Sequence, residues 1–156
     1  WCETPDHYPQ STFWARGNGW LFNCANDLID IDHDNARATA VGEIGRKALE
    51  AMHAHQDRSG FFHHILDDHH SKLEASATVM FAYGVGEAMR HGIIGDEMLE
   101  DAVRAYRAVE DTVTEDGAVP GVAVPPGGPG VPFGTTLFGQ GFFLLAGHSL
   151  RKHLGL

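Results

Sequence analysis

The stretch Trp14-Ala15-Arg16-Gly17-Asn18-Gly19-Trp20 organises this chain. Two tryptophans bracket an arginine, an asparagine and two glycines, just before an apolar run with helical spacing. Tryptophan offers a flat face and arginine a fixed fork of donors, which together suit a sugar ring carrying a carboxylate. The glycines let other groups approach the backbone closely. The stretch therefore predicts one wall of a carbohydrate pocket, with these candidate substrate-binding residues: Trp14, Arg16, Asn18 and Trp20.

Each of these residues also has a structural interpretation. Arg16 could stack on a neighbouring tryptophan and pair with an acid in the core, rather than grip a substrate carboxylate. Trp14 and Trp20 could be large core anchors, because buried tryptophans are often structural. Asn18 could cap a helix through its side chain.

Composition narrows the class of protein. The 156 residues and a hydrophobic fraction of 43% fit a single domain over residues 1–156 with one substantial core. A net charge of −10, from 21 acidic and 11 basic residues, disfavours a nucleic-acid partner. No apolar run approaches the roughly 18 residues of a membrane span. The two cysteines form neither a disulfide framework nor a zinc module, so a cytoplasmic protein is expected, with Cys24 as a small core residue.

Hydrophobic spacing predicts five helices, after a loop over residues 1–13. The helices are expected over residues 18–31, 35–55, 71–90, 96–113 and 139–153. The first has an apolar stripe made of Leu21, Cys24, Ala25, Leu28 and Ile31. Residues 61–66 predict a short extended segment, and residues 120–136, rich in proline and glycine, predict a long loop. Loops of this length are usually functional or disordered.

The third helix is nearly free of charge. Ser71-Lys72-Leu73-Glu74 matches the capping box, with a hydroxyl at the N-cap and a carboxylate at the third helical position. The pattern after it carries no charge until Glu87, which predicts a helix buried on all sides. The capping box accounts for Glu74 by itself, and a catalytic role for Glu74 stays open beside it.

Charge-poor and amphipathic helices alternate along the chain. The helices over 18–31, 71–90 and 139–153 begin with small residues, whereas those over 35–55 and 96–113 have one charged side. This alternation predicts an all-α helical toroid with inner and outer helices. Inner helices that begin at one rim would present free N–H groups and positive dipole ends to a carboxylate. An open toroid would also expose apolar faces of the first and last helices, and such faces usually find a partner.

The histidine-rich segment over residues 63–70 invites a metal interpretation, because histidine and aspartate are good ligands. Adjacent histidines diverge in an extended segment, however, so solvated loop histidines are expected and neither a metal nor a cofactor is predicted. Gln140, between two glycines at the start of the last helix, could contact a ligand or serve the helix start.

Four motifs occur in an order that resembles a known family. They are the stretch over 14–20, Gly60-Phe61-Phe62-His63 with Leu66-Asp67-Asp68, the run from Leu73 to Tyr83, and Gly139-Gln140-Gly141 with the apolar residues to Ala146. They are similar to the C-terminal half of the unsaturated glucuronyl and rhamnogalacturonyl hydrolases, glycoside hydrolase families 105 and 88. Lys72 departs from the pattern, which tends to have an aromatic residue there.

The resemblance implies part of an (α/α)6 barrel and a substrate with a 4,5-unsaturated uronic acid at its non-reducing end. In the family, the C4=C5 bond is hydrated and the unstable hemiketal opens to release the sugar, which differs from displacement at the anomeric carbon. The resemblance also makes His63 and Gln140 candidate substrate-binding residues, and makes Arg16 the grip on the uronate carboxylate.

The catalytic residue itself is not assigned. The resemblance implies an aspartate upstream of the Trp-Arg motif, and only 13 residues precede Trp14. The chain is therefore expected to be the C-terminal half of such a barrel, completed by an N-terminal half or a homo-oligomer. The alternatives are a non-catalytic carbohydrate-binding or structural remnant, and another helical-toroid sugar enzyme such as an epimerase.

Overall fold

A computed structural model describes residues 12–32, 36–125, 127 and 130–155. Within these residues the chain forms five helices and two short antiparallel hairpins. The helices are α1 (Ala15–Ile31), α2 (Ala36–His53), α3 (Ala75–Arg90), α4 (Leu99–Glu110) and α5 (Leu137–Leu154). One hairpin pairs β1 (Phe62–His63) with β2 (Leu73–Glu74), and the other pairs β3 (Val122–Ala123) with β4 (Phe133–Gly134). The prediction of an all-α fold with five helices is confirmed; most of the predicted loop over 1–13 lies outside the described residues.

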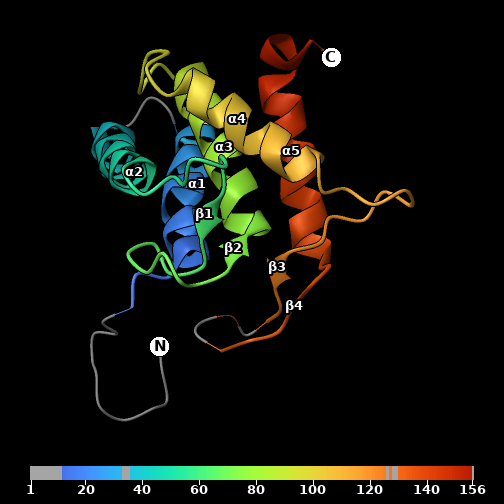
Figure 1. Cartoon of the computed structure of the whole chain (residues 1–156). Coiled ribbons are helices and arrows are strands. Elements are labelled where there is room, and N and C mark those ends of the chain that lie inside the picture. The colour runs from blue at the N-terminus through green and yellow to red at the C-terminus, as the bar shows by residue number, and fades with distance from the viewer. Residues whose placement is uncertain (1–11, 33–35, 126, 128–129, 156) are drawn as a thin grey trace.

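The helices form two layers. In one layer α3 lies between α1 and α5, and all three begin at the end of the molecule where the β3–β4 hairpin lies (Figure 1). In the other layer α2 packs against α1 and α3, whereas α4 packs against α3 and α5. This is the alternation of inner and outer helices that the charge pattern predicts.

Helix α3 is the centre of the core. Its residues from Ala75 to Ala82 are all buried, which confirms the prediction of a helix buried on all sides. Phe81 is fully buried, with its ring centroid 4.9 Å from that of Phe62 and 5.7 Å from that of His53. The Phe81 side chain therefore joins α3 to α2 and to β1.

The predicted apolar stripe of α1 is mostly exposed, and Ala25 alone of its five members lies on the buried side. Leu21, Leu28 and Ile31 are 49%, 51% and 79% exposed, and Cys24 is exposed as well, so its assignment to the core was wrong. The buried side carries Phe22, Ala25 and Ile29 together with two asparagines, Asn23 and Asn26. The asparagine amides donate to the carbonyl oxygens of Met80 and Gly84 on α3. Hydropathy counts asparagine as an outward residue, and therefore selects the wrong face.

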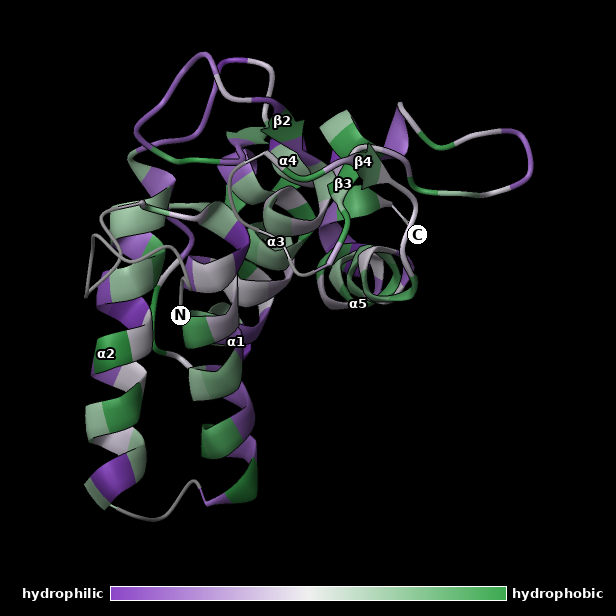
Figure 2. Ribbon diagram, turned by 90° about the horizontal axis from the view of Figure 1, so that it is seen from below, coloured by the Kyte–Doolittle hydropathy of each residue, from purple (hydrophilic) through white to green (hydrophobic). Residues whose placement is uncertain are grey.

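Helix α5 also exposes apolar side chains. Leu137, Leu144 and Leu145 are 92%, 70% and 45% exposed, and Figure 2 shows hydrophobic residues along α1 and around α5. The expectation that the first and last helices present apolar faces is thus confirmed. We call the set of Leu21, Leu28, Ile31, Leu137, Leu144 and Leu145 the open apolar face.

The starts of α3, α4 and α5 differ from the predictions. Helix α3 does not begin at Ser71, because Leu73 and Glu74 are extended and pair with β1; Glu74 is instead the N-cap residue. Helix α4 begins at Leu99 rather than after Asp96, and its N-cap Met98 makes no side-chain cap bond. Helix α5 begins two residues before Gly139, because the Thr136 hydroxyl accepts a hydrogen bond from the Gly139 N–H at 3.1 Å.

Candidate carbohydrate-binding site

A hollow of about 200 Å³ lies where α1 and α5 begin. Helix α1 starts at Ala15 rather than at Asn18, so the Trp-Arg motif forms its first turn and not the loop before it. Trp14 is the N-cap residue, and Trp20, 43% exposed, lies edge-on to Phe142 at 5.2 Å between ring centroids. The residues that line the hollow are Trp14, Arg16, Trp20, Pro125 and Phe138.

Arg16 lies in this wall with its guanidinium between two aromatic rings. The central carbon is 5.0 Å from the ring centroid of Trp14 and 4.7 Å from that of Phe138. A guanidinium over an aromatic face is attracted by the ring quadrupole, and the attraction grows when water is excluded. Arg16 is only 3% exposed, so the two rings fix the plane of the guanidinium.

One edge of the guanidinium is bound by the protein. The Nη1 group donates to the carbonyl oxygen of Ala123 at 2.7 Å, and it lies 3.3 Å from Ser76 Oγ and 3.4 Å from Glu74 Oε1. Within the described part of the chain, Nε and Nη2 make no hydrogen bond. Burial lowers the pKa of Arg16, and the Glu74 carboxylate opposes that shift. Arg16 can therefore offer charged donors to a ligand while the other edge is held.

Glu74 is the fully buried acid at the base of this arrangement. Its carboxylate accepts hydrogen bonds from Ser76 Oγ at 2.7 Å, from the Ala77 N–H at 2.6 Å and from the Ala123 N–H at 2.9 Å. Sequence reasoning placed it at the third position of a capping box; in the structure it caps α3 itself. In the sequence, the signal for this capping role is a carboxylate directly before a helix that has no other charge in its first turns.

Gly127, in the loop before β4, approaches Trp14 and Arg16 closely. It has φ +82°, and a Cβ there would lie 2.3 Å from Trp14 Cζ2 and 2.6 Å from Arg16 Nη2. Only a residue without a side chain can approach the two groups this closely. The loop predicted over residues 120–136 thus contributes Pro125 and Gly127 to the site.

Substitution of Gly127 tests this contact. We expect Gly127→Ala to displace Trp14 and Arg16 and to weaken binding of a uronate ligand by about tenfold. The matched control is Gly130→Ala, since Gly130 has φ +78° but no atom within 4 Å of its added Cβ. Titration followed by tryptophan fluorescence compares the two. Equal losses in both variants would mean that backbone strain, and not contact with Trp14 and Arg16, carries the effect.

Three other predicted site residues lie outside the hollow. Asn18 is in the first turn of α1, where its Nδ2 donates to the carbonyl oxygen of Trp14 at 2.9 Å; it is not the N-cap. His63 is buried, with Nδ1 2.6 Å from the carbonyl oxygen of Ser71. The Gln140 amide donates to the Gly117 carbonyl at 3.0 Å and accepts from the Val119 N–H, which holds a turn. Contact between these side chains and a sugar stays a prediction.

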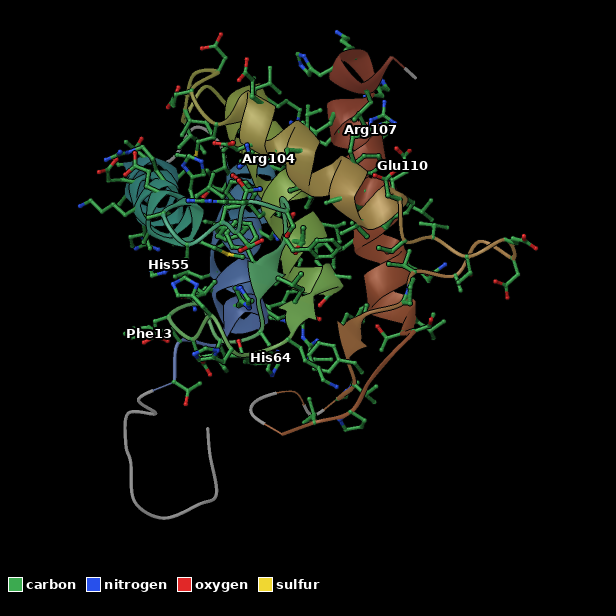
Figure 3. The ribbon with its side chains drawn as sticks, in the orientation of Figure 1. Phe13, His55, His64, Arg104, Arg107 and Glu110 are labelled. Atoms are coloured by element: carbon green, nitrogen blue, oxygen red, sulfur yellow. The ribbon has the colours of Figure 1, made fainter. Side chains whose placement is uncertain are left out.

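The histidine-rich segment is only partly solvated. His63 and His64 are 8% and 4% exposed, against the expectation, whereas His69 and His70 are exposed. The backbone explains the burial: the His64 carbonyl accepts from the Ala15 N–H, and Figure 3 shows His64 and Phe13 at the end of the molecule where α1 begins.

Elsewhere in the described residues, Asp30, Glu87 and His91 lie close enough to share an ion. Arg90 Nη2 already bonds both carboxylates, at 2.5 Å and 2.6 Å.

Comparison with known proteins places the chain in a family. Residues 3–154 match the family described as Glycosyl Hydrolase Family 88. The chain belongs to this family. The family 88 chain is 31% identical over 122 residues to an unsaturated rhamnogalacturonyl hydrolase of Bacillus subtilis, covering 76% of this chain and 33% of that protein. It is 28% identical over 114 residues to an unsaturated 3S-rhamnoglycuronyl hydrolase of an Alteromonas strain, covering 70% of this chain and 28% of that protein.

Solved structures give the same result for the fold. A possible member of family GH105 from Salmonella enterica superposes with a TM-score of 0.85 and 30% identity, covering 98% of this chain and 43% of that one. The helical layers of the family 88 chain are thus those of (α/α)6 barrel enzymes. The chain spans about a third of the length of the curated relatives described above. Within its described residues, no helix is long and apolar enough to cross a membrane.

Proposed function

We propose that this chain is the substrate-binding half of a hydrolase that acts on oligosaccharides ending in an unsaturated uronic acid. The reaction is hydration of the C4=C5 bond, after which the hemiketal opens and the sugar is released. The names of two relatives, an unsaturated 3S-rhamnoglycuronyl hydrolase and an unsaturated rhamnogalacturonyl hydrolase, support the substrate class. Their sequence identity to this chain does not establish which sugar follows the uronate.

The observation that carries the proposal is the held guanidinium of Arg16. A uronate has an apolar ring face and a carboxylate, and the hollow offers aromatic walls beside a buried fork of N–H donors. The Nε and Nη2 groups can bind the two oxygens of a carboxylate side by side. Trp14 and Trp20 then contact the ring. Asn18, His63 and Gln140 are proposed to act further along the oligosaccharide, since they lie outside the hollow.

The chemistry also needs a proton donor. Within the described residues, the buried carboxylate paired with Arg16 is that of Glu74, and it accepts hydrogen bonds from Arg16, from Ser76 and from two backbone N–H groups. We therefore assign Glu74 no proton transfer. The aspartate that protonates the double bond is proposed to come from an N-terminal half of the enzyme, which fits the share of the relatives' length that this chain spans.

Arg16→Ala in the complete enzyme tests the function. We expect kcat/KM on lyase-generated unsaturated disaccharides to fall about 100-fold, because a charge-assisted pair with the substrate carboxylate is lost. The decrease of the unsaturated uronate's ultraviolet absorbance measures the rate. Arg151→Ala is the matched control, since Arg151 is exposed at the far end of α5 and donates to the His148 carbonyl of its own helix. Unchanged activity of Arg16→Ala would contradict the assignment of Arg16 as the residue that binds the substrate carboxylate.

The open apolar face is proposed to be the surface that meets the rest of the barrel. Large exposed apolar patches on soluble proteins mark interaction sites. When the chain is studied alone, we expect it to self-associate through this face, and we expect Leu28→Glu with Leu144→Glu to shift it toward the monomer. Sedimentation velocity measures the change, with Leu73→Glu, at a separate and 38% exposed leucine, as the control. Equal effects of both changes would place the contact elsewhere.

The remaining properties follow from composition. The acidic net charge disfavours a nucleic-acid partner. We propose a cytoplasmic enzyme that needs no cofactor or metal, on the cysteine and histidine usage of the sequence.

A further inference from the structure

We propose that Glu74 is a positioning residue that sets the direction in which Arg16 presents its donors to the substrate. The inference rests on the proposed function, in which Arg16 binds the uronate carboxylate. Glu74 is fully buried, does not line the hollow, and lies 3.4 Å from Arg16 Nη1. It reaches no reacting atom and acts through Arg16.

The aromatic rings alone cannot set this direction. Trp14 and Phe138 lie 5.0 Å and 4.7 Å from the guanidinium carbon and define its plane. Changes in the side-chain dihedral angles can still swing the guanidinium within that plane, and such a movement would change the edge that faces the ligand. The bonds of Nη1 remove this freedom, because they hold one corner and leave Nε and Nη2 on the other edge.

Glu74 determines those bonds in two ways. The direct contact with Arg16 Nη1 is 3.4 Å, which is long for a hydrogen bond and acts mainly as an attraction between charges. The second way is through Ala123. Glu74 Oε1 accepts from the Ala123 N–H at 2.9 Å, and the carbonyl of the same residue accepts the short 2.7 Å bond from Arg16. Glu74 therefore places the strongest partner of Nη1 as well as attracting it.

Ser76 completes the arrangement. Its hydroxyl lies 2.7 Å and 2.9 Å from the two carboxylate oxygens of Glu74, and it accepts from Arg16 at 3.3 Å. The Ala77 N–H fixes the second oxygen at 2.6 Å. The carboxylate is thus immobile before a substrate arrives, which is the condition for a preorganised donor.

Chemical rescue with guanidinium ion tests the inference. Arg16→Ala leaves a space between Trp14 and Phe138 with the Glu74 carboxylate at its base. We expect free guanidinium at millimolar concentration to bind there saturably, with a change in tryptophan fluorescence of this chain. Adding Glu74→Gln to the same variant is expected to weaken that binding at least about tenfold, because the charged partner is gone. Urea, neutral and of the same shape, is the control ligand and should show no such dependence on Glu74.

The rescue can also be measured as enzyme activity. In the complete enzyme, guanidinium should restore kcat to Arg16→Ala and not to Arg16→Ala with Glu74→Gln. A purely structural Glu74 would leave the two variants with equal guanidinium affinities and equal rescue, and either result would overturn the positioning role. If circular dichroism shows that the double variant is unfolded, Glu74→Asp replaces Glu74→Gln; it retracts the carboxylate by one methylene, and the same outcomes decide.

The two proposals fail separately. If the complete unmodified enzyme leaves the absorbance of unsaturated uronates unchanged, the proposed function is lost, and guanidinium binding to this chain still decides the role of Glu74. If the enzyme is active and guanidinium binds equally with and without Glu74, the function stands and the positioning role is lost.

Discussion

Glu74→Gln is expected to lower the free energy of unfolding of this chain by about 3 kcal/mol, because one partner of a buried ion pair is removed. Arg16 would keep its charge at 3% exposure without an acid beside it. The new amide creates a second conflict. Both carboxylate oxygens accept from N–H groups, those of Ala77 and Ala123, so one N–H would face the amide nitrogen of glutamine.

Chemical denaturation followed by circular dichroism measures the loss. The matched control is Glu115→Gln, since Glu115 is exposed in the turn after α4, and its change should stay within about 0.5 kcal/mol. The double variant with Arg16→Met should lose less than the sum of the single variants, because the buried charges are then removed together. A Glu74→Gln variant as stable as the unmodified chain would show that Glu74 is not paired as an anion.

Phe81→Ala is expected to lower the free energy of unfolding by about 3–5 kcal/mol, the range for phenylalanine removed from a packed core. Phe81 is fully buried in the central helix, with ring contacts to Phe62 at 4.9 Å and to His53 at 5.7 Å. The ring therefore joins α3 to β1 and to α2, and its removal leaves a cavity at the point where three elements meet.

Phe13→Ala provides the control for this cavity. Phe13 is 59% exposed ahead of α1, so the same change there should cost little. Thermal unfolding of the three proteins gives the comparison. A similar loss in both variants would mean that Phe81 is less tightly enclosed than its full burial indicates, or that residues near Phe13 carry more of the stability.

The layered helical fold could be predicted from the sequence because charged residues distinguish the outer helices from the charge-poor inner ones. Residues 75–86 carry no charge and form the buried centre, and α4 keeps its charged side outward. The orientation of α1 could not be predicted in this way. Asn23 and Asn26 bond carbonyl oxygens of α3, and those partners are 57 and 58 residues away in sequence.

The same distinction, between local sequence patterns and contacts across the sequence, applies to the candidate site. Trp14, Arg16 and Trp20 occur within seven residues, so a local pattern could identify them, and the structure brings all three to one hollow. Phe138 and Pro125 complete the walls from more than 100 residues downstream, and no local pattern links them to Arg16. Glu74 was predicted at the third position of a helix capped by Ser71, and the physical reason still holds, because a carboxylate suits a helix start. The strand pairing of Leu73 and Glu74 with β1 decides where that start lies, and the helical pattern after Ser71 does not reveal this pairing.

Ala123 gives both of its main-chain polar groups to the Arg16–Glu74 pair, at 2.7 Å and 2.9 Å. Displacement of Ala123 would therefore remove a hydrogen bond from each member of the pair. We therefore expect a substitution that displaces β3 to loosen the Arg16 side chain without touching the hollow, by raising the fraction of molecules in which this strand is out of place. The order of the guanidinium thus depends on a strand of two residues.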